Sequence, residues 1–190
     1  YPDFGTYTVT LSNVSGICQA EPVTMEVIIN PQIVINELPD FTVCDGNEVT
    51  LTADTNLDLE AYAAIWCNAA GDTLFVGGEY VFVPTEDIDV TLKVSDVNDC
   101  NDMQTINVNV FDFDLDVSFP EVFCGGAEVP VTVTNNSDGD LSYVWGPADC
   151  VISGGDTANP VLTASGDNKQ FTVTATNNET GCTMDFLYDI

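Results

Sequence analysis

The stretch FTVTATNNETGC at residues 171–182 alternates apolar and polar residues, then enters a polar turn that ends at a cysteine. Two similar stretches precede it, YTVTLSNVSGIC at residues 7–18 and VTLKVSDVNDC at residues 90–100. The cysteines that end the three stretches, Cys18, Cys100 and Cys182, are equally spaced along the sequence. Helical and leucine-rich repeats recur every ~20 to 50 residues, so the longer period of ~80 residues predicts one small β domain per repeat.

Two further markers recur at almost the same distance. Cys44 and Cys124 are separated by nearly this period, and each is followed by a tight turn and a predicted strand. Trp66 and Trp145 are separated by nearly the same interval. Three markers in one register predict a tandem array of repeats.

The register divides the chain into three segments. We expect residues 1–30 to be the C-terminal hairpin of a preceding repeat, residues 31–111 to be a complete repeat, and residues 112–190 to be another. The chain is then expected to be a segment of a longer protein.

The composition restricts the functions that the chain can have. It contains 31 Asp plus Glu, two Lys, and no Arg or His, which gives a formal charge of −29 at pH 7. Phosphate binding needs basic side chains that release counterions, so we expect no nucleic-acid binding. The chain is 45% hydrophobic with a mean hydropathy of +0.12, which is too apolar for a disordered acidic tail. No apolar run reaches the ~18 residues of a membrane helix, so we expect no membrane insertion.

The secondary structure is predicted to be β-strand throughout. Apolar residues occupy every second position in residues 49–53, 90–94 and 171–175, which is the period of a half-buried strand. Short polar turns separate these stretches. Strands at this spacing predict a two-sheet sandwich of about seven strands. Trp66 and Trp145 fall where a third strand would place an aromatic side chain between the sheets.

The repeat pattern resembles a known group of surface proteins. The pattern (V/F)C-x-G-x-E-V-x-(L/V)-T, a mid-repeat Trp, (Y/F)TVT-x-(S/T)N…GC and a closing strand is similar to the immunoglobulin-like and PKD-like tandem repeats of very large Bacteroidota cell-surface adhesins. The resemblance spans the whole chain. It implies an all-β fold of tandem immunoglobulin-like β-sandwich repeats of about 80 residues. It also implies type IX secretion, an extracellular place at the cell surface, and a stalk role in a filament for adhesion or gliding motility.

Seven cysteines in such a chain predict disulfides. Cys44 and Cys124 fall at the turn between the first and second strands, whereas Cys100 and Cys182 fall at the turn between the sixth and seventh. In immunoglobulin connectivity these turns lie at opposite poles of one sandwich. A strand of about seven residues is ~23 Å long, whereas disulfide Cα atoms lie within about 7 Å of each other.

Three disulfide pairings remain open. We favour a bridge between consecutive repeats, where the first turn of one repeat meets the sixth-to-seventh turn of the next. This layout pairs Cys44 with Cys182 and leaves Cys18, Cys100 and Cys124 to pair outside this segment. Under a different topology the bridges lie within repeats, and join Cys44 to Cys100 and Cys124 to Cys182. The third layout joins Cys44 to Cys67 and Cys124 to Cys150.

Aspartates gather at two places and suggest a cation site. The turn SDVNDCND contains Asp96, Asp99 and Asp102. The stretch FDFDLDV is expected to place Asp112, Asp114 and Asp116 on one face of a strand at the junction of two repeats. Carboxylate oxygens without His suit calcium, which is the one cofactor that the sequence suggests. The alternative is that these side chains are solvated, and no loop has the full spacing of a calcium-binding motif.

Two threonines are candidates for modification. Asp-Thr-Leu at 72–74 and Asp-Thr-Ala at 156–158 are similar to the Asp-Ser/Thr-aliphatic acceptor of Bacteroidota O-glycosylation. Thr73 and Thr157 both follow turn residues, where a hydroxyl group is accessible.

Catalysis is not expected. Without His, only carboxylates or the two lysines could activate a nucleophile. Carboxylate pairs do occur in glycosidases, but a compact repeat of this size offers no deep cleft. Lys93 shares the outward parity of its strand with Thr91 and Ser95, so we expect it to be a solubilising charge.

The expected partners are neighbouring repeats of the same chain, with lateral self-association and surface polysaccharide as further candidates. We expect the repeats to meet through the disulfide and through packing of Phe111, Phe113, Phe119 and Phe123. The alternative function is a calcium- or glycan-binding β-sandwich module of a secreted protein.

Overall fold

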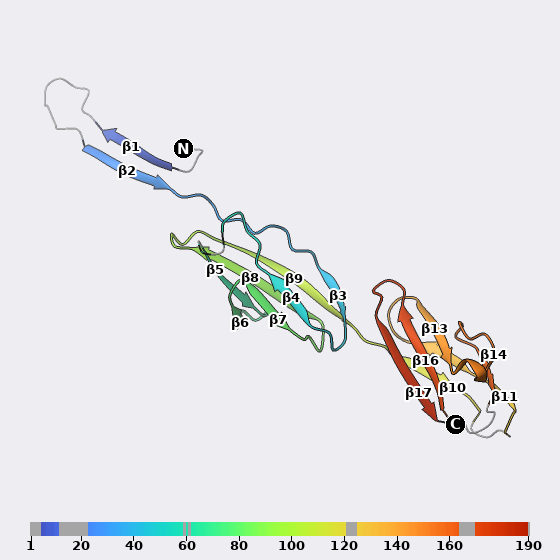
Figure 1. Cartoon of the computed structure of the whole chain (residues 1–190). Coiled ribbons are helices and arrows are strands. Elements are labelled where there is room, and N and C mark those ends of the chain that lie inside the picture. The colour runs from blue at the N-terminus through green and yellow to red at the C-terminus, as the bar shows by residue number, and fades with distance from the viewer. Residues whose placement is uncertain are drawn as a thin grey trace, which may run out of the picture. The chain divides into compact units, whose positions relative to one another are not determined.

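The computed structural model describes residues 5–11, 23–58, 60, 62–120, 125–163 and 170–189. The regular secondary structure of these residues is almost all β-strand (Figure 1). In this described part of the chain, no helix is long and apolar enough to cross a membrane.

The chain forms two compact units. Unit 1 takes its residues from 1–39, 50–81 and 89–106, and unit 2 from 40–49, 82–88 and 107–190. The units do not coincide with the sequence repeats, because residues 40–49 and 82–88 group with the C-terminal half of the chain. The boundary between repeats at residues 111 and 112 therefore stays a prediction.

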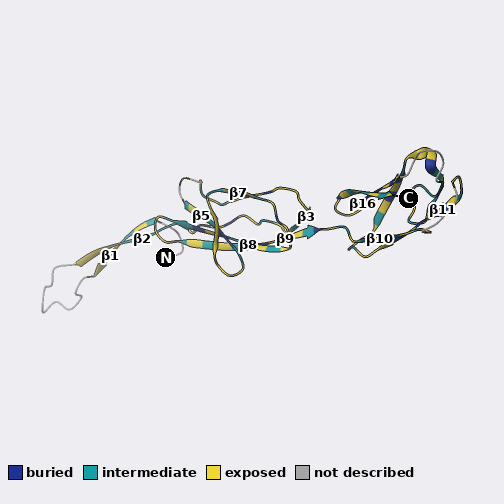
Figure 2. Ribbon diagram, turned by 90° about the horizontal axis from the view of Figure 1, so that it is seen from below, coloured by how far each residue is buried: buried dark blue, intermediate teal, exposed yellow. Residues whose placement is uncertain are grey.

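The first two strands, β1 (Gly5–Leu11) and β2 (Val23–Ile29), form an antiparallel pair of their own. Gly5 lies opposite Ile29, and Leu11 lies opposite Val23. Leu11 and Val23 are 66% and 67% exposed, and most of β1 is exposed in Figure 2. The pair therefore builds no closed core by itself, and its assignment to a preceding repeat stays a prediction.

Seven strands follow in two sheets. The larger sheet has the order β3 (Phe41–Cys44), β9 (Asn101–Phe111), β8 (Ile88–Asp96), β5 (Tyr62–Cys67), β6 (Thr73–Val76), and the smaller pairs β4 (Val49–Thr52) with β7 (Glu79–Phe82). The order β9-β8-β5-β6 is the G-F-C-C′ order of an immunoglobulin sandwich, and β4 with β7 is its B-E pair. β3 adds to the edge parallel to β9, with Cys44 opposite Phe111.

The remaining strands give a second sandwich. β13 (Leu141–Gly146), β16 (Gln170–Asn177) and β17 (Thr183–Asp189) form one sheet, in the order β13-β16-β17. The other strands are β10 (Leu115–Ser118), β12 (Thr132–Asn135), β11 (Glu128–Pro130), β15 (Val161–Thr163) and β14 (Val151–Ser153). β10 pairs with β12, and β11 pairs with β15, which also pairs with β14.

Only Val131 separates β11 from β12, so the two pieces act as one interrupted strand. The N–H of Val131 donates to the carbonyl of Pro160 at 3.0 Å, and the N–H of Val133 donates to that of Ala158 at 2.8 Å. The resulting order is A-B-E-D in one sheet and C-F-G in the other, which is the constant-type immunoglobulin topology. A short 3₁₀ turn, η2 (Ala148–Cys150), connects β13 to β14.

The buried side chains follow the predicted alternation. Val90, Leu92 and Val94 on β8 are at most 1% exposed, and residues 171–175 on β16 alternate in the same way. Trp66 is fully buried, and Trp145 is 5% exposed. The prediction that both tryptophans pack between the sheets is confirmed.

Both tryptophans make the same hydrogen bond. The indole Nε1 of Trp66 donates to the carbonyl of Gly77 at 3.0 Å, and that of Trp145 donates to the carbonyl of Thr157 at 2.9 Å. A buried indole N–H without a partner is costly. The equivalent bonds show that the two sandwiches place their central aromatic by the same local plan.

Candidate functional site

Unit 2 contains a disulfide between Cys44 and Cys182. Their Cα atoms are 5.5 Å apart, although the residues are 138 positions apart in the sequence. Cys44 is the last residue of β3, and Cys182 directly precedes β17. This is the pairing between consecutive repeats that the sequence favoured. A half-cystine forms one bond, so the pairings of Cys44 with Cys100 or Cys67, and of Cys182 with Cys124, are excluded.

Backbone hydrogen bonds around Cys44 fix the position of this cysteine at the end of β3. The N–H of Asp45 donates to the carbonyl of Phe111 at 3.0 Å, which continues the parallel pairing of β3 with β9 by one residue. The N–H of Asn47 then donates to the carbonyl of Cys44 at 3.1 Å and closes a turn. Gly46 has φ of +77° in this turn, which favours glycine. The Cys-Asp-Gly sequence therefore holds the sulfur at the end of the strand.

Asn177 organises the turn that carries Cys182. Its Oδ1 accepts hydrogen bonds from the N–H groups of Glu179 and Thr180 at 2.8 and 2.9 Å. Its Nδ2 donates to the carbonyl of Asp138 at 3.1 Å, and its backbone N–H donates to the carbonyl of Cys182 at 2.8 Å. Asn177 is only 2% exposed, so these bonds satisfy a buried amide.

The structural role of Asn177 was not predicted. A signal was present, because Asn177 is the Asn of the (Y/F)TVT-x-(S/T)N pattern, shortly before the following strand. Asp96 holds the matching place before Cys100. The role became visible only through the hydrogen bonds.

The turn between β8 and β9 repeats this plan with a carboxylate. Oδ1 of Asp96 accepts hydrogen bonds from the N–H groups of Asn98 and Cys100 at 2.8 and 2.9 Å. The N–H of Asp96 donates to the carbonyl of Cys100 at 2.9 Å. Asp99 has φ of +61°, as Gly181 has +74° just before Cys182. Both turns thus end in a left-handed residue followed by cysteine.

These hydrogen bonds change how Asp96 and Cys100 titrate. Desolvation acts to raise the pKa of Asp96, but the bonds from Asn98 and Cys100 outweigh it and lower the pKa below 3.8. Desolvation, followed by the charges of Asp96 and Asp99, raises the pKa of the Cys100 thiol above 9.0. Cys100 is therefore a thiol that resists ionisation.

The other cysteines differ in their surroundings. Within the described residues, Cys67 is buried and Cys100 is partly exposed, and neither forms a disulfide. Cys150 is buried at the end of η2. The predictions for Cys18 and Cys124 lie outside the described residues.

Several candidate calcium ligands have structural hydrogen bonds. Oδ2 of Asp102 accepts from the N–H of Ile35, and Oδ1 accepts from the N–H of Met103, both at 2.9 Å. Oδ2 of Asp116 accepts from the amide of Asn136 at 3.0 Å. These contacts give the two carboxylates a local role in holding loops.

Asp112, Asp114 and Asp116 are all exposed and alternate with the partly buried Phe113 and Leu115. Only Asp116 lies in a strand, because β10 begins at Leu115. Across the parts of the chain that the structure describes, no three Asp, Glu or Cys side chains are grouped so that they could hold a metal ion. Calcium binding stays a prediction.

Aromatic rings form a second connection within unit 2. The ring of Phe111 is 4.9 Å from that of Phe113, and Phe113 is 6.2 Å from Phe186 on β17, both edge to face. Phe119 packs separately against Tyr188 at 6.3 Å. The predicted contribution of Phe123 lies outside the described residues.

A hollow of about 290 Å³ also lies in unit 2, next to the segments that carry the two half-cystines. Thr42 on β3 and Thr180 in the turn before Cys182 both line it. Asp87, Asp138 and Glu179 give it an acidic wall. Oδ1 of Asp87 accepts a 2.7 Å hydrogen bond from the N–H of Val110, so this carboxylate holds the end of β9.

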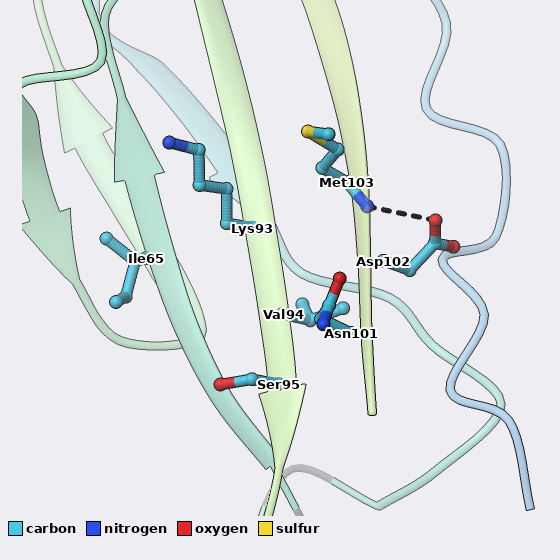
Figure 3. A pocket seen from close by; sticks show the side chains of 7 residues that line it. All are labelled: Ile65, Lys93, Val94, Ser95, Asn101, Asp102 and Met103. Carbon is cyan, nitrogen blue, oxygen red and sulfur yellow. Dashed lines mark hydrogen bonds between the residues drawn. The ribbon is translucent and has the colours of Figure 1, made fainter. Parts of the chain in front are cut away.

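A groove of about 410 Å³ lies on the outer side of the large sheet in unit 1 (Figure 3). It is lined by Ile65, Lys93, Val94, Ser95, Asn101, Asp102 and Met103. Lys93 is exposed, as predicted, and it is the one basic residue in the described part of the chain. Met103 is 69% exposed. The groove was not predicted, because its lining residues come from three strands that are separated in the sequence.

The two threonine candidates lie at exposed positions. Thr73 is the first residue of β6. The hydroxyl of Thr157 donates to the carbonyl of Gly154 at 2.9 Å and accepts from the N–H of Asn159 at 3.3 Å. Glycosylation of either residue stays a prediction.

No family model matches the sequence, and no curated protein matches it. Among solved structures, the IG1 and IG2 domains of DIP-gamma are 11% identical, with 84% of this chain and 96% of that chain covered and a TM-score of 0.45. The insect immune protein hemolin is 13% identical, with 96% and 54% covered and a TM-score of 0.44. Domains 3–5 of Drosophila OTK are 11% identical, with 98% and 70% covered and a TM-score of 0.41. Because these identities and TM-scores are low, the fold is assigned from the strand order of the sheets. That order gives the chain an all-β, immunoglobulin-like fold.

Proposed function

We propose that this chain is a structural stalk segment of a cell-surface adhesin whose consecutive repeats are joined by disulfides. The Cys44–Cys182 bridge carries the proposal. It bonds the first-turn cysteine of one sequence repeat to the last-turn cysteine of the next. A bridge inside one repeat would stabilise that repeat alone, whereas a bridge across the sequence boundary ties two repeats into one mechanical element.

The chemistry of the chain supports an extracellular location. Structural disulfides persist in oxidising environments outside the cytosol. A formal charge of −29 keeps such a chain soluble and repels anionic surfaces. The resemblance to Bacteroidota adhesin repeats adds type IX secretion and a role in gliding motility to the proposal.

Salt screens the repulsion between acidic repeats, so direct contacts between neighbouring repeats are needed to hold the stalk in shape. At ~0.15 M salt the Debye length is about 8 Å, so repulsion between acidic repeats acts only over short distances. The disulfide and the Phe111–Phe113–Phe186 contacts do not depend on that repulsion. They suit a stalk that must keep its form in salt water. Neighbouring repeats are then the main partners, and the segment needs no catalytic activity.

The test uses intact cells of the source strain. Antibodies raised against residues 31–190 should label intact cells, and an in-frame deletion of these residues should weaken attachment to surfaces. A strain that carries Cys44→Ser and Cys182→Ser should still display the protein but attach less firmly under flow. Labelling that appears only after lysis would overturn the proposal.

The groove on β5, β8 and β9 favours a second candidate function, glycan binding. Lys93, Ser95 and Asn101 offer polar groups to sugar hydroxyls, and Ile65 and Met103 offer apolar contacts. Calorimetry with surface polysaccharides should give heat that is lost in Lys93→Ala, with Lys93→Arg as the conservative control. Calorimetry with calcium in the same buffer tests the cation alternative.

A further inference from the structure

We propose that the Cys44–Cys182 disulfide is a tension bypass, which carries a pulling force past the folded sandwiches and not through them. The inference deepens the proposed stalk function and rests on it, because only a chain pulled from its ends experiences such a force. It follows from the connectivity of the chain, independently of how the two units are placed.

The covalent path of the force is short. A pull on the two ends travels along the backbone to Cys44, crosses the S–S bond, and leaves along the backbone from Cys182. The sequence separation of 138 leaves 137 residues between the two cysteines, and none of these lies on the path. The path contains only residues 1–43 and 183–190 besides the two half-cystines.

The bypassed part contains most of both sandwiches. The strands from β4 to β16, both buried tryptophans and the whole aliphatic core of β8 lie between the two cysteines. An extending force cannot lengthen this closed loop while the bridge is intact. The hydrogen bonds that these strands make with one another, and the packing between them, are therefore spared the load.

The strands next to the bridge leave little slack. β3 ends at Cys44, and β17 begins directly after Cys182, so the force enters and leaves the bridge along chain that is already extended. An extended residue spans about 3.3 Å, which is close to its limit of about 3.3 to 3.6 Å. Tension on β17 can peel the strand from β16 but releases almost no length by straightening it.

The hidden length is large. At about 3.3 to 3.6 Å per residue, the 137 bypassed residues correspond to about 450 to 490 Å of extended chain. The 51 residues outside the pair, 43 before Cys44 and eight after Cys182, correspond to about 170 to 180 Å. With the disulfide intact, the chain should therefore reach only a short maximum extension. The length of the 137 residues between the two cysteines becomes available only when the bridge is broken.

Single-molecule force spectroscopy on the whole chain, held by its ends, tests the inference. The wild-type chain should never extend beyond about 190 Å, which includes the 5.5 Å between the two half-cystine Cα atoms, whereas Cys44→Ser/Cys182→Ser should extend by up to about 450 to 490 Å more. Cys100→Ser removes a cysteine that is outside the bridge and should behave as the wild type. Equal maximum extension of the wild type and the double variant would overturn the bypass.

A second measurement avoids any folding defect of the double variant. The wild-type chain is held at a force that unfolds the double variant, and tris(2-carboxyethyl)phosphine is added. The phosphine and water reduce the S–S bond to two thiols, and the phosphine becomes its oxide. The chain should then lengthen by several hundred ångströms, and no lengthening would contradict the inference. Because this readout needs no cells, its failure is distinct from failure of the surface-labelling test.

Discussion

Phe113 lies edge-on to Phe111, with their ring centroids 4.9 Å apart and their planes at 87°. The next contact of Phe113 is Phe186, whose centroid is 6.2 Å away. Edge-to-face pairs contribute about 0.5 to 1.5 kcal/mol beyond the burial of apolar area. The three rings connect the end of β9 to β17 without using the disulfide, so the two connections can be separated by mutation.

Phe113→Ala should remove both ring contacts at once. Fully buried Phe→Ala changes cost about 3 to 5 kcal/mol, and we expect about 2 to 3 kcal/mol because Phe113 is only partly buried. Urea denaturation followed by fluorescence measures the loss. Leu187→Ala is the control, since Leu187 follows Phe186 on β17 and is 59% exposed. An equal loss of unfolding free energy in the two variants would show that the ring contacts of Phe113 do not stabilise the fold.

Loss of the disulfide should have a larger effect. The chain-entropy model gives about 5 kcal/mol for a loop of 138 residues. Cys44→Ser/Cys182→Ser should therefore lower the melting temperature of unit 2 by many degrees, as calorimetry would show. Cys100→Ser should leave it nearly unchanged. A double variant that melts with the wild type would mean that the bridge does not constrain the unfolded chain.

Asn177→Ala should loosen the turn that holds Cys182. The N–H groups of Glu179 and Thr180 lose their shared acceptor, and each unsatisfied donor costs about 1 to 3 kcal/mol where it stays buried. Asn177→Asp keeps the acceptor oxygen and should recover part of the loss. We expect faster reduction of the bridge by dithiothreitol in the alanine variant, measured by thiol titration. The exposed Asn178→Ala is the matched control, and a reduction rate in Asn177→Ala no higher than in this control would refute the role of Asn177.

Cys100 should react slowly with iodoacetamide at neutral pH. Its pKa lies above 9.0 through desolvation and the charges of Asp96 and Asp99, so the thiolate is scarce below that pH. The rate should rise as the pH approaches and passes this value. Asp99→Asn removes one negative charge, which should lower the pKa and speed alkylation at pH 8. Mass spectrometry of the Cys100 peptide gives the rate, and no change in Asp99→Asn would rule out the electrostatic cause.

Much of the fold could be predicted from the alternation of apolar and polar residues along the strands. The alternation in residues 90–94 and 171–175 fixes which side chains face the core, and a one-residue shift would have exposed them all. Trp66 and Trp145 were likewise placed correctly, because a large aromatic in a central strand has few alternatives to burial. The positions of Cys44, Cys100 and Cys182 in their turns followed from counting strands.

Contacts between distant residues were harder to predict. The parallel pairing of β3 with β9 joins residues near 42 to residues near 109, and neither stretch contains a signal for the other. The grouping of residues 40–49 and 82–88 with unit 2 depends on such contacts. The same is true of Asn177, whose acceptors and donors could be identified only once the turn was built.

The position of β6 at the end of the large sheet has a consequence for solubility at high concentration. An edge strand with unpaired backbone groups is a template for another chain, and on β6 Leu74, Phe75 and Val76 are 36%, 40% and 64% exposed. Its length of four residues limits how well a second chain can add to it. A sugar on Thr73, the first residue of β6, would shield this edge with a hydrophilic cover. Glycosylation would then hinder copies of this chain from associating through this edge.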